Sequence, residues 1–320
     1  PFENVYYSKS IDARTWSPAK LLEGEVNTDG HDACVGLSPD GNTLYIFRTN
    51  ENQVGGDLYE SLFIDNKWIT PVRMSKNING LYSIEPSASI SLDGSTFYFS
   101  SNREGGFGGF DLYRVIKLPN GEWSLPLNLG PGVNTIFDED APYIHPDGTS
   151  LYFSSKGFQN MGGYDIFKSV SKDGVFQSPV NLGAPTNSTK DDIYFTISAN
   201  EQHGYYSSGK KGGYGKQDIY RIDYLERSLR QSVISAKVTL NGTPSFSEIS
   251  LIDLETGEMV GVYSSNPTTG KFIFLVNPDV EYELIVEVDG AEEYSEIVSY
   301  TVEDLLHNQK KLIQLKGGAK

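Results

Sequence analysis

A unit of 53 or 54 residues recurs along the first two thirds of the chain and restricts the fold more than any other feature. Its clearest mark is a turn ending in Asp-Gly, which degenerates in the fourth copy. The four copies are Ser38–Gly41, Ser91–Gly94, His145–Gly148 and Ser198–Glu201. Successive turn Asp or Asn residues are separated by 53, 54 and 53 positions. Asp caps such a turn and Gly supplies its positive φ, so each copy predicts a tight hairpin.

The remainder of the unit repeats in phase with this turn. An aromatic strand follows each turn, and a Gly-rich loop then leads to a strand that opens with Asp. An aromatic residue marks an outer strand at Trp16, Trp68, Trp123 and Phe176. Each unit therefore reads as four short strands, which is typical of β-propeller blades around a central channel. An open solenoid would have shorter repeats of one or two strands.

The number of blades depends on how the ring closes. Residues 4–8 match residues 57–61, and Trp16 matches Trp68, so the chain enters in the middle of a blade with only its two outer strands. If the inner strands lie ahead of Pro1, the propeller has five blades. If the N-terminal strands close the ring against the last unit, it has four. We expect five, and a processed chain or a fragment from which any signal peptide or lipid anchor has been removed.

After about residue 230 the aromatic repeat stops and shorter alternating strands begin. Segments such as 233–240 and 282–287 alternate apolar with polar residues, as half-buried strands do. Seven or so such strands in this segment predict a β-sandwich. The sequence thus predicts an all-β chain of two domains, with a propeller over residues 1–230 and a sandwich over residues 231–320.

The charge argues against a nucleic-acid ligand, and the hydropathy argues against a membrane-spanning helix. With 26 Lys and Arg against 42 Asp and Glu, the formal net charge is −16, which argues against nucleic acid as a ligand. No apolar stretch approaches the roughly 20 residues that a membrane-spanning helix needs. The single cysteine, Cys34, lies in an apolar run and is expected to be a small core residue.

One set of acidic residues recurs at a fixed position of the repeat that lies outside the turn. Each stands eight positions before the turn Asp or Asn, where the innermost strand of a blade should begin. The set is Asp32, Glu85, Glu139 and Asp192. If the four carboxylates circle one mouth of the channel, oxygen ligands of this kind suit Ca²⁺. Their recurrence in every blade favours the other interpretation, in which each accepts hydrogen bonds from the backbone of a neighbouring blade.

No constellation of catalytic residues emerges, so the sequence predicts a protein that is not an enzyme and needs no cofactor. The Gly-Gly loops join strand to strand and lead to no helix N-terminus that could hold a phosphate. Glycoside hydrolysis is the enzymatic alternative, because propellers hold paired carboxylates at the channel mouth. Asp138, Glu139 and Asp140 form the one dense acidic cluster of the repeats, without an asymmetrically placed second carboxylate.

The repeat resembles a known family. Its pattern of Ser-Pro-Asp-Gly, Leu-Tyr-Phe-Ser-Ser, Gly-Gly-x-Asp-Leu-Tyr and Trp-Ser-x-Pro-x-Asn-Leu is similar to the PD40 repeats of TolB-like propellers, most clearly over residues 91–129 and 146–182. The C-terminal segment resembles a carboxypeptidase regulatory-like domain, a transthyretin-like sandwich. Together they resemble the middle of PorE-type envelope proteins of Bacteroidota, which run from tetratricopeptide repeats through these two domains to an OmpA-like domain.

This resemblance implies a non-enzymatic scaffold in the periplasm, associated with the outer membrane and with the type IX secretion system. The implied partners are other envelope or secretion-apparatus proteins, with a glycan-binding or glycan-cleaving propeller as the alternative function. Peptidoglycan contact in that family belongs to the OmpA-like part. It is therefore expected only if such a domain follows in the parent protein, and it transfers to no residue of this chain.

Overall fold

The computed structural model describes all residues except 1–2, 13–14, 51–54, 225–230, 307–309 and 318–320. The described residues are almost entirely strand and loop, with one short helix, α1 (Val302–Leu306). They form two compact units. The first comprises residues 1–144, 149–196 and 205–220, and the second comprises 145–148, 197–204 and 221–320. The all-β expectation is confirmed, and the expected domain boundary falls at the edge of the undescribed residues 225–230.

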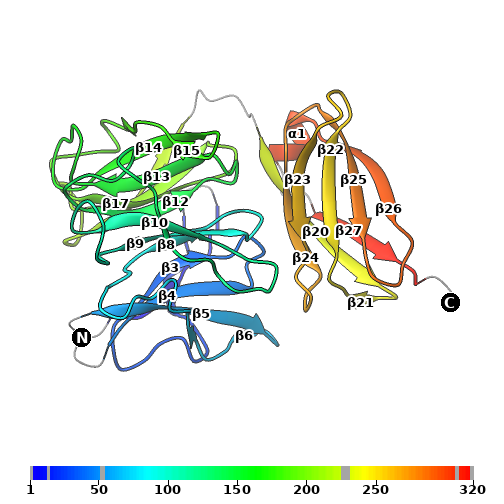
Figure 1. Ribbon diagram of the computed structural model, residues 1–320, viewed down its shortest axis with the longest axis horizontal. Helices are drawn as coiled ribbons and strands as arrows, with labels where there is room; N and C mark the ends of the chain where they lie inside the picture. Colours follow the sequence, from blue (N-terminus) through cyan, green and yellow to red (C-terminus); the bar gives the residue numbers. More distant parts are fainter. Residues whose placement is uncertain (1–2, 13–14, 51–54, 225–230, 307–309, 318–320) are drawn as a thin grey trace. The chain divides into compact units, whose positions relative to one another are not determined.

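Five antiparallel sheets in chain order build the repeats (Figure 1). The first is a two-stranded sheet of β1 (Tyr6–Tyr7) and β2 (Lys20–Leu21). The second contains β3 (Asp32–Leu37), β4 (Thr43–Thr49), β5 (Gly56–Ile64), β6 (Lys67–Trp68) and β7 (Val72–Arg73). The third contains β8 (Ala88–Ile90), β9 (Thr96–Ser101), β10 (Asp111–Ile116) and β11 (Leu127–Asn128). The fourth contains β12 (Glu139–Ile144), β13 (Ser150–Ser155), β14 (Asp165–Lys172), β15 (Val175–Phe176) and β16 (Val180–Asn181). The fifth contains β17 (Asp192–Ile197), β18 (His203–Ser208) and β19 (Asp218–Asp223).

The repeated turn joins the first two strands of four of these sheets. Gly94 and Gly148 have φ of 71° and 69°, the left-handed conformation that glycine adopts without a steric penalty. In the degenerate fourth copy Glu201 takes the same place with φ of 52°. The hairpin expected from the Asp-Gly pattern is therefore present in all four copies.

Consecutive sheets pack face to face through aromatic and aliphatic side chains. Between the second and third sheets, Leu58 lies against Phe97 and Phe99. Between the third and fourth, Leu112 lies against Leu151 and Phe153. All six are at most 1% exposed. Burial of a side chain of this size contributes about 1.5–3 kcal/mol, so these junctions hold the first unit together.

The second unit contains two four-stranded sheets. One pairs β20 (Ser232–Leu240) with β21 (Thr243–Pro244), β24 (Lys271–Val276) and β27 (Lys310–Leu315), and β27 runs parallel to β20. The other has the order β23 (Met259–Ser264), β22 (Glu248–Asp253), β25 (Glu281–Glu287) and β26 (Tyr294–Ser299). Burial alternates along β24 and β25, as the sequence periodicity predicts. The transthyretin-like topology and the number of blades stay predictions.

One expectation about a single residue is wrong. Cys34, expected in the core, is exposed on β3. Its counterpart in the fourth sheet, Ala141, is only 5% exposed because the preceding sheet covers it. No inner strands of a preceding sheet face β3 in the described part of the chain, so the same sequence position stays open to solvent.

Candidate functional site

The four acidic residues that the repeat singles out lie at or just before the first strand of the second, third, fourth and fifth sheets, and all are at most 1% exposed. Their first hydrogen bonds come from the loop that leads into that strand. The Thr28 amide donates to Asp32 Oδ2 at 2.6 Å, and the Thr135 amide donates to Glu139 Oε2 at 2.7 Å. The carboxylates thus fasten the loop to the strand.

A second partner comes from the neighbouring strand of the same sheet. Arg48 Nε donates to Asp32 Oδ1 at 2.6 Å. Ser101 Oγ donates to Glu85 Oε1 at 2.6 Å, and Ser155 Oγ to Glu139 Oε1 at 2.7 Å. The donors therefore belong to the same sheet, whereas the sequence suggested the backbone of a neighbouring blade. Burial raises the pKa of Glu85 and of Glu139, and these hydroxyl donors act in the opposite direction.

The proposed calcium role of these carboxylates remains a prediction. Among the residues that the structure describes, no group of three His, Cys, Asp or Glu side chains is placed to hold a metal ion. The structure therefore supplies an architectural account of Asp32, Glu85 and Glu139 in their own sheets, and among the described residues it does not bring three of the four carboxylates together.

Two further repeated side chains have roles that the sequence did not reveal. Asn79, Asn134 and Asn187 each accept a hydrogen bond from the third strand at 2.8 Å, from the amides of Leu58, Leu112 and Ile166 respectively. Asp111 accepts the amides of Phe107 and Gly108 at 2.6 and 3.0 Å, which closes the Gly-rich loop. The signal was present as recurrence at a fixed repeat position, but the partner lies more than 20 residues away for each Asn.

Two loops of each repeat gather at one end of its sheet. In the fourth sheet Glu139 pairs with Ser155, and Ser155 with Asp165, so the loop before β12 and the loop between β13 and β14 lie at the same end. Loops of neighbouring repeats also touch there. The amide of Phe110 donates to Asp138 Oδ1 at 3.1 Å, and that of Tyr164 to Asp191 Oδ1 at 3.0 Å.

These loops expose large apolar side chains, which we call the apolar rim. Tyr82 is 95% exposed, Leu81 84% and Ile136 77%. The full set is Leu81, Tyr82, Phe107, Ile136, Phe137, Phe158, Met161 and Tyr214. Lys190, Lys211 and Lys216 are exposed on the same loops. The sequence did not predict this surface, although an apolar pair between turn residues, as in Leu81-Tyr82 and Ile136-Phe137, is a signal that could have indicated it.

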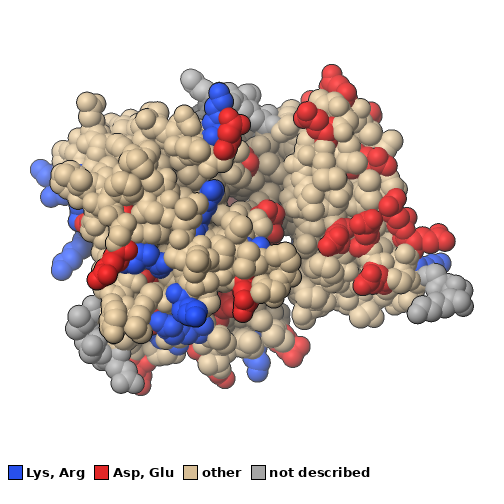
Figure 2. Space-filling model, in the orientation of Figure 1, with Lys and Arg blue, Asp and Glu red and all other residues tan. Residues whose placement is uncertain are grey.

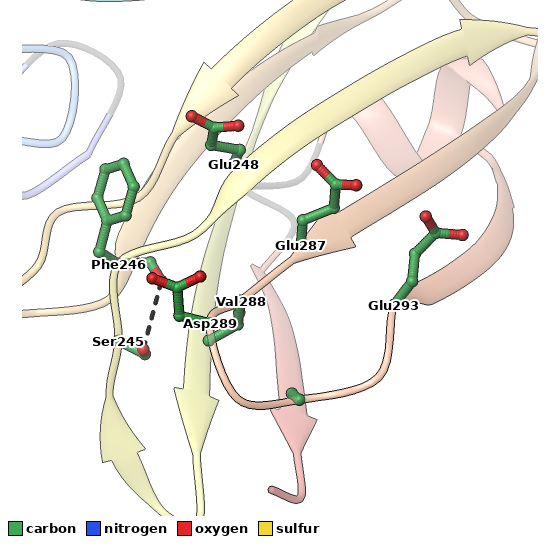
Figure 3. A pocket seen from close by; sticks show the side chains of 8 residues that line it. Ser245, Phe246, Glu248, Glu287, Val288, Asp289 and Glu293 are labelled. Carbon is green, nitrogen blue, oxygen red and sulfur yellow. Dashed lines mark hydrogen bonds between the residues drawn. The ribbon is translucent and has the colours of Figure 1, made fainter. Parts of the chain in front are cut away.

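Charge is distributed differently over the two units. Figure 2 shows Asp and Glu gathered over the second unit on the visible face, whereas Lys and Arg are seen mainly over the first. Residues 231–320 hold 14 acidic and 6 basic side chains, so 20 of the 26 basic residues precede them. A shallow groove of about 570 Å³ in the second unit is lined by Glu248, Glu287, Asp289 and Glu293 (Figure 3). Those carboxylates come from β22, β25 and the loop after β25, and they form no metal-binding group.

No helix among the described residues is long and apolar enough to cross a membrane. No protein-family model matches the sequence, and no curated protein matches it. The comparison with solved structures, by contrast, finds many chains with a similar fold.

The structural neighbours include TolB-like propellers. One is a protein from Agrobacterium tumefaciens that is named as a putative TolB. It has 17% identity and a TM-score of 0.41, and the match covers 81% of this chain and 79% of the TolB chain. TolB from Acinetobacter baumannii has 13% identity and a TM-score of 0.39, covering 80% of this chain and 51% of its own. An α-L-arabinofuranosidase from Podospora anserina has 16% identity and a TM-score of 0.45, covering 69% and 82%. These likenesses concern the fold, and no activity transfers from them.

The expectation that this chain is not an enzyme, drawn from the missing constellation of catalytic residues, is contradicted by the enzymes among its structural neighbours. Besides the arabinofuranosidase, the neighbours include puromycin hydrolase and prolyl endopeptidases, at 12% identity each. This chain covers 35% of puromycin hydrolase and 38% of the prolyl endopeptidase.

Proposed function

We propose that this protein is a protein-interaction scaffold of a bacterial envelope, and that it binds its partner through the apolar rim. The observation that supports this is the exposure of eight large apolar side chains on touching loops. Large apolar side chains exposed together on neighbouring loops are typical of interaction sites. Aromatic side chains and Met, which make up most of the rim, are also the residues enriched in protein–protein interfaces.

The family resemblance gives the proposal its cellular setting. PD40-like repeats followed by a carboxypeptidase regulatory-like segment point to the PorE-type proteins of Bacteroidota, and hence to the periplasm and the outer membrane. The partner would then be another envelope protein or a component of the type IX secretion apparatus. Contact with peptidoglycan would require an OmpA-like domain elsewhere in the parent protein.

The rim can be tested by co-purification from cross-linked envelopes of the source bacterium. The double variant Tyr82→Asp, Ile136→Asp places two charges in the rim, at side chains that are 95% and 77% exposed and so do not support the core. We expect recovery of the partner to fall about tenfold or more, equivalent to about 1.4 kcal/mol of binding free energy.

The matched control is Leu125→Asp, which adds a charge at a side chain 79% exposed but outside the rim. It should recover the same outer-membrane or secretion-apparatus protein as the unmodified chain. Equal recovery by the rim variant would overturn the proposed binding face. Failure of the unmodified chain to recover any envelope protein would overturn the scaffold role itself.

A further inference from the structure

One sheet of the second unit has a face that points away from the core. In the sheet of β23, β22, β25 and β26, alternate side chains are buried and those between them point outward. The outward set includes large apolar side chains on both edge strands, where Met259 is 59% exposed, Val262 55% and Ile297 63%. Half-buried isoleucines of the two central strands lie between them. We call this set the outer stripe, and its members are Ile252, Met259, Val262, Ile285 and Ile297.

The strand register joins these side chains into one patch. Val262 and Ile285 both pair with Ser250 of β22, from its two sides. Met259 pairs with Ile252, two residues further along β22. Positions two residues apart on a strand are about 7 Å apart, so the two rows adjoin. The outer stripe therefore runs across the sheet from one edge strand to the other.

A row of carboxylates borders the outer stripe at one end. Glu248 of β22 and Glu287 of β25 pair directly with each other, in the row that adjoins Ser250. Like charges placed opposite each other in a sheet destabilise it. Asp289 and Glu293 add two more carboxylates to the groove that this pair lines (Figure 3). Negative charge is thus concentrated at the end of an apolar face.

This sheet supplies no positive charge of its own. The strands β22, β23, β25 and β26, all of them described, contain no Lys or Arg. Lys311 of β27 pairs with Glu296 at 2.7 Å, but Glu296 lies opposite the buried Leu284 and so on the inner side of the sheet. Within the described part of the chain, the four groove carboxylates form no ion pair. The outer face therefore combines exposed apolar surface with uncompensated negative charge.

We propose that this outer face is a docking surface for a basic amphipathic segment of a partner protein. The apolar side chains of that segment cover the outer stripe, and its Lys or Arg side chains enter the groove between Glu248 and Glu287. A cation placed there relieves the repulsion between the two carboxylates, so charge and apolar burial favour the same partner. Nucleic acid and anionic lipid carry the wrong sign for this groove. The surface shares no residue with the apolar rim, so the proposal goes beyond the interaction proposed above.

The test uses the full chain and a fluorescein-labelled synthetic helix with Leu on one face and Lys on the other. Fluorescence anisotropy measures binding. The groove variant Glu248→Gln, Glu287→Gln should weaken binding by about tenfold or more, and so should the stripe variant Val262→Ser, Ile297→Ser. All four side chains are exposed, so both variants should fold as the unmodified chain does.

The matched control is Glu255→Gln, Glu258→Gln, which removes the same number of carboxylates from the exposed turn at the other end of β22. Its affinity should stay within about twofold of that of the unmodified chain. Helices with Ser in place of Leu, or with Glu in place of Lys, should bind at least about tenfold more weakly.

Two results would overturn the proposal directly: groove and control variants that bind with the same affinity, or Leu and Ser helices that do. Sedimentation of the unmodified chain provides a third. A dimer that the stripe variant converts to a monomer would assign the outer face to a second copy of this chain and so contradict the proposed occupant.

Discussion

At the scale of single residues, a buried carboxylate is costly because burial disfavours its charged form. Asp140 lies at the junction of the third and fourth sheets, where Ser87 Oγ donates to its Oδ1 and the Ala141 amide donates to the same atom. Burial raises the pKa of Asp140, with these donors acting against the shift. The charged form is therefore disfavoured in the folded protein.

The consequence is a pH-dependent cost that Asp140→Asn should relieve. An Asp with a raised folded pKa gives its full stability below its unfolded pKa, near 3.9, and loses stability as the pH rises through the folded pKa. Asn keeps an oxygen acceptor and carries no charge, so we expect the variant to melt a few °C higher at pH 7, with a smaller gain near pH 4. Thermal unfolding followed by circular dichroism across this range measures the difference.

Asp29→Asn is the matched control, since Asp29 is exposed and its replacement should shift the melting temperature little at any pH. A variant Asp140→Asn that melts below the unmodified chain at pH 7 would show that the carboxylate's hydrogen bonds outweigh its buried charge.

At the scale of elements, the Gly-rich loops fit closely against the next repeat. A Cβ at Gly108 would lie 1.8 Å from the Phe137 carbonyl oxygen and 2.7 Å from that of Thr135. Both contacts are with backbone, which cannot move aside as a flexible side chain can. The loop that presents Phe107 and the loop that presents Ile136 and Phe137 can therefore approach this closely only because Gly108 has no side chain.

Gly108→Ala should accordingly destabilise the protein by about 1–3 kcal/mol, measured as a lower urea midpoint of unfolding. Gly215→Ala is the control in the corresponding loop of the fifth sheet, because the nearest atom to its Cβ would be 3.4 Å away. If both variants unfold at the same urea concentration, the contact between the two loops contributes nothing to stability.

The elements are also where sequence and structure can be compared most directly. Strands and hairpins were predictable because the alternation of side chains and the Asp-Gly turns are local properties. The four buried carboxylates were predictable as a set, but their donors were not: Ser155 is 16 residues from Glu139, and only the strand register brings the two together. The apolar rim was missed because the exposure of Tyr82 depends on which neighbour covers its loop.

At the scale of the whole molecule, two units with separate cores have been assembled from one chain. The second unit buries Ile249, Leu251, Phe272 and Phe274, all at most 2% exposed. We expect residues 231–320 to fold on their own, and the full chain to unfold in two steps. Differential scanning calorimetry of the full chain and of the isolated segment measures both. An isolated segment without a cooperative transition would mean that the second unit depends on the first.

The parallel pairing of β20 with β27 has a mechanical consequence. Six residue pairs, from Ser235 with Lys310 to Leu240 with Leu315, join the first and last strands of this segment. Because the strands run in the same direction, the start of β20 and the end of β27 lie at opposite ends of the pairing. Tension applied between those two points loads the hydrogen bonds in shear, all together, and does not unzip them one at a time. We therefore expect this segment to resist a pulling force better than a strand pair that such a force would unzip.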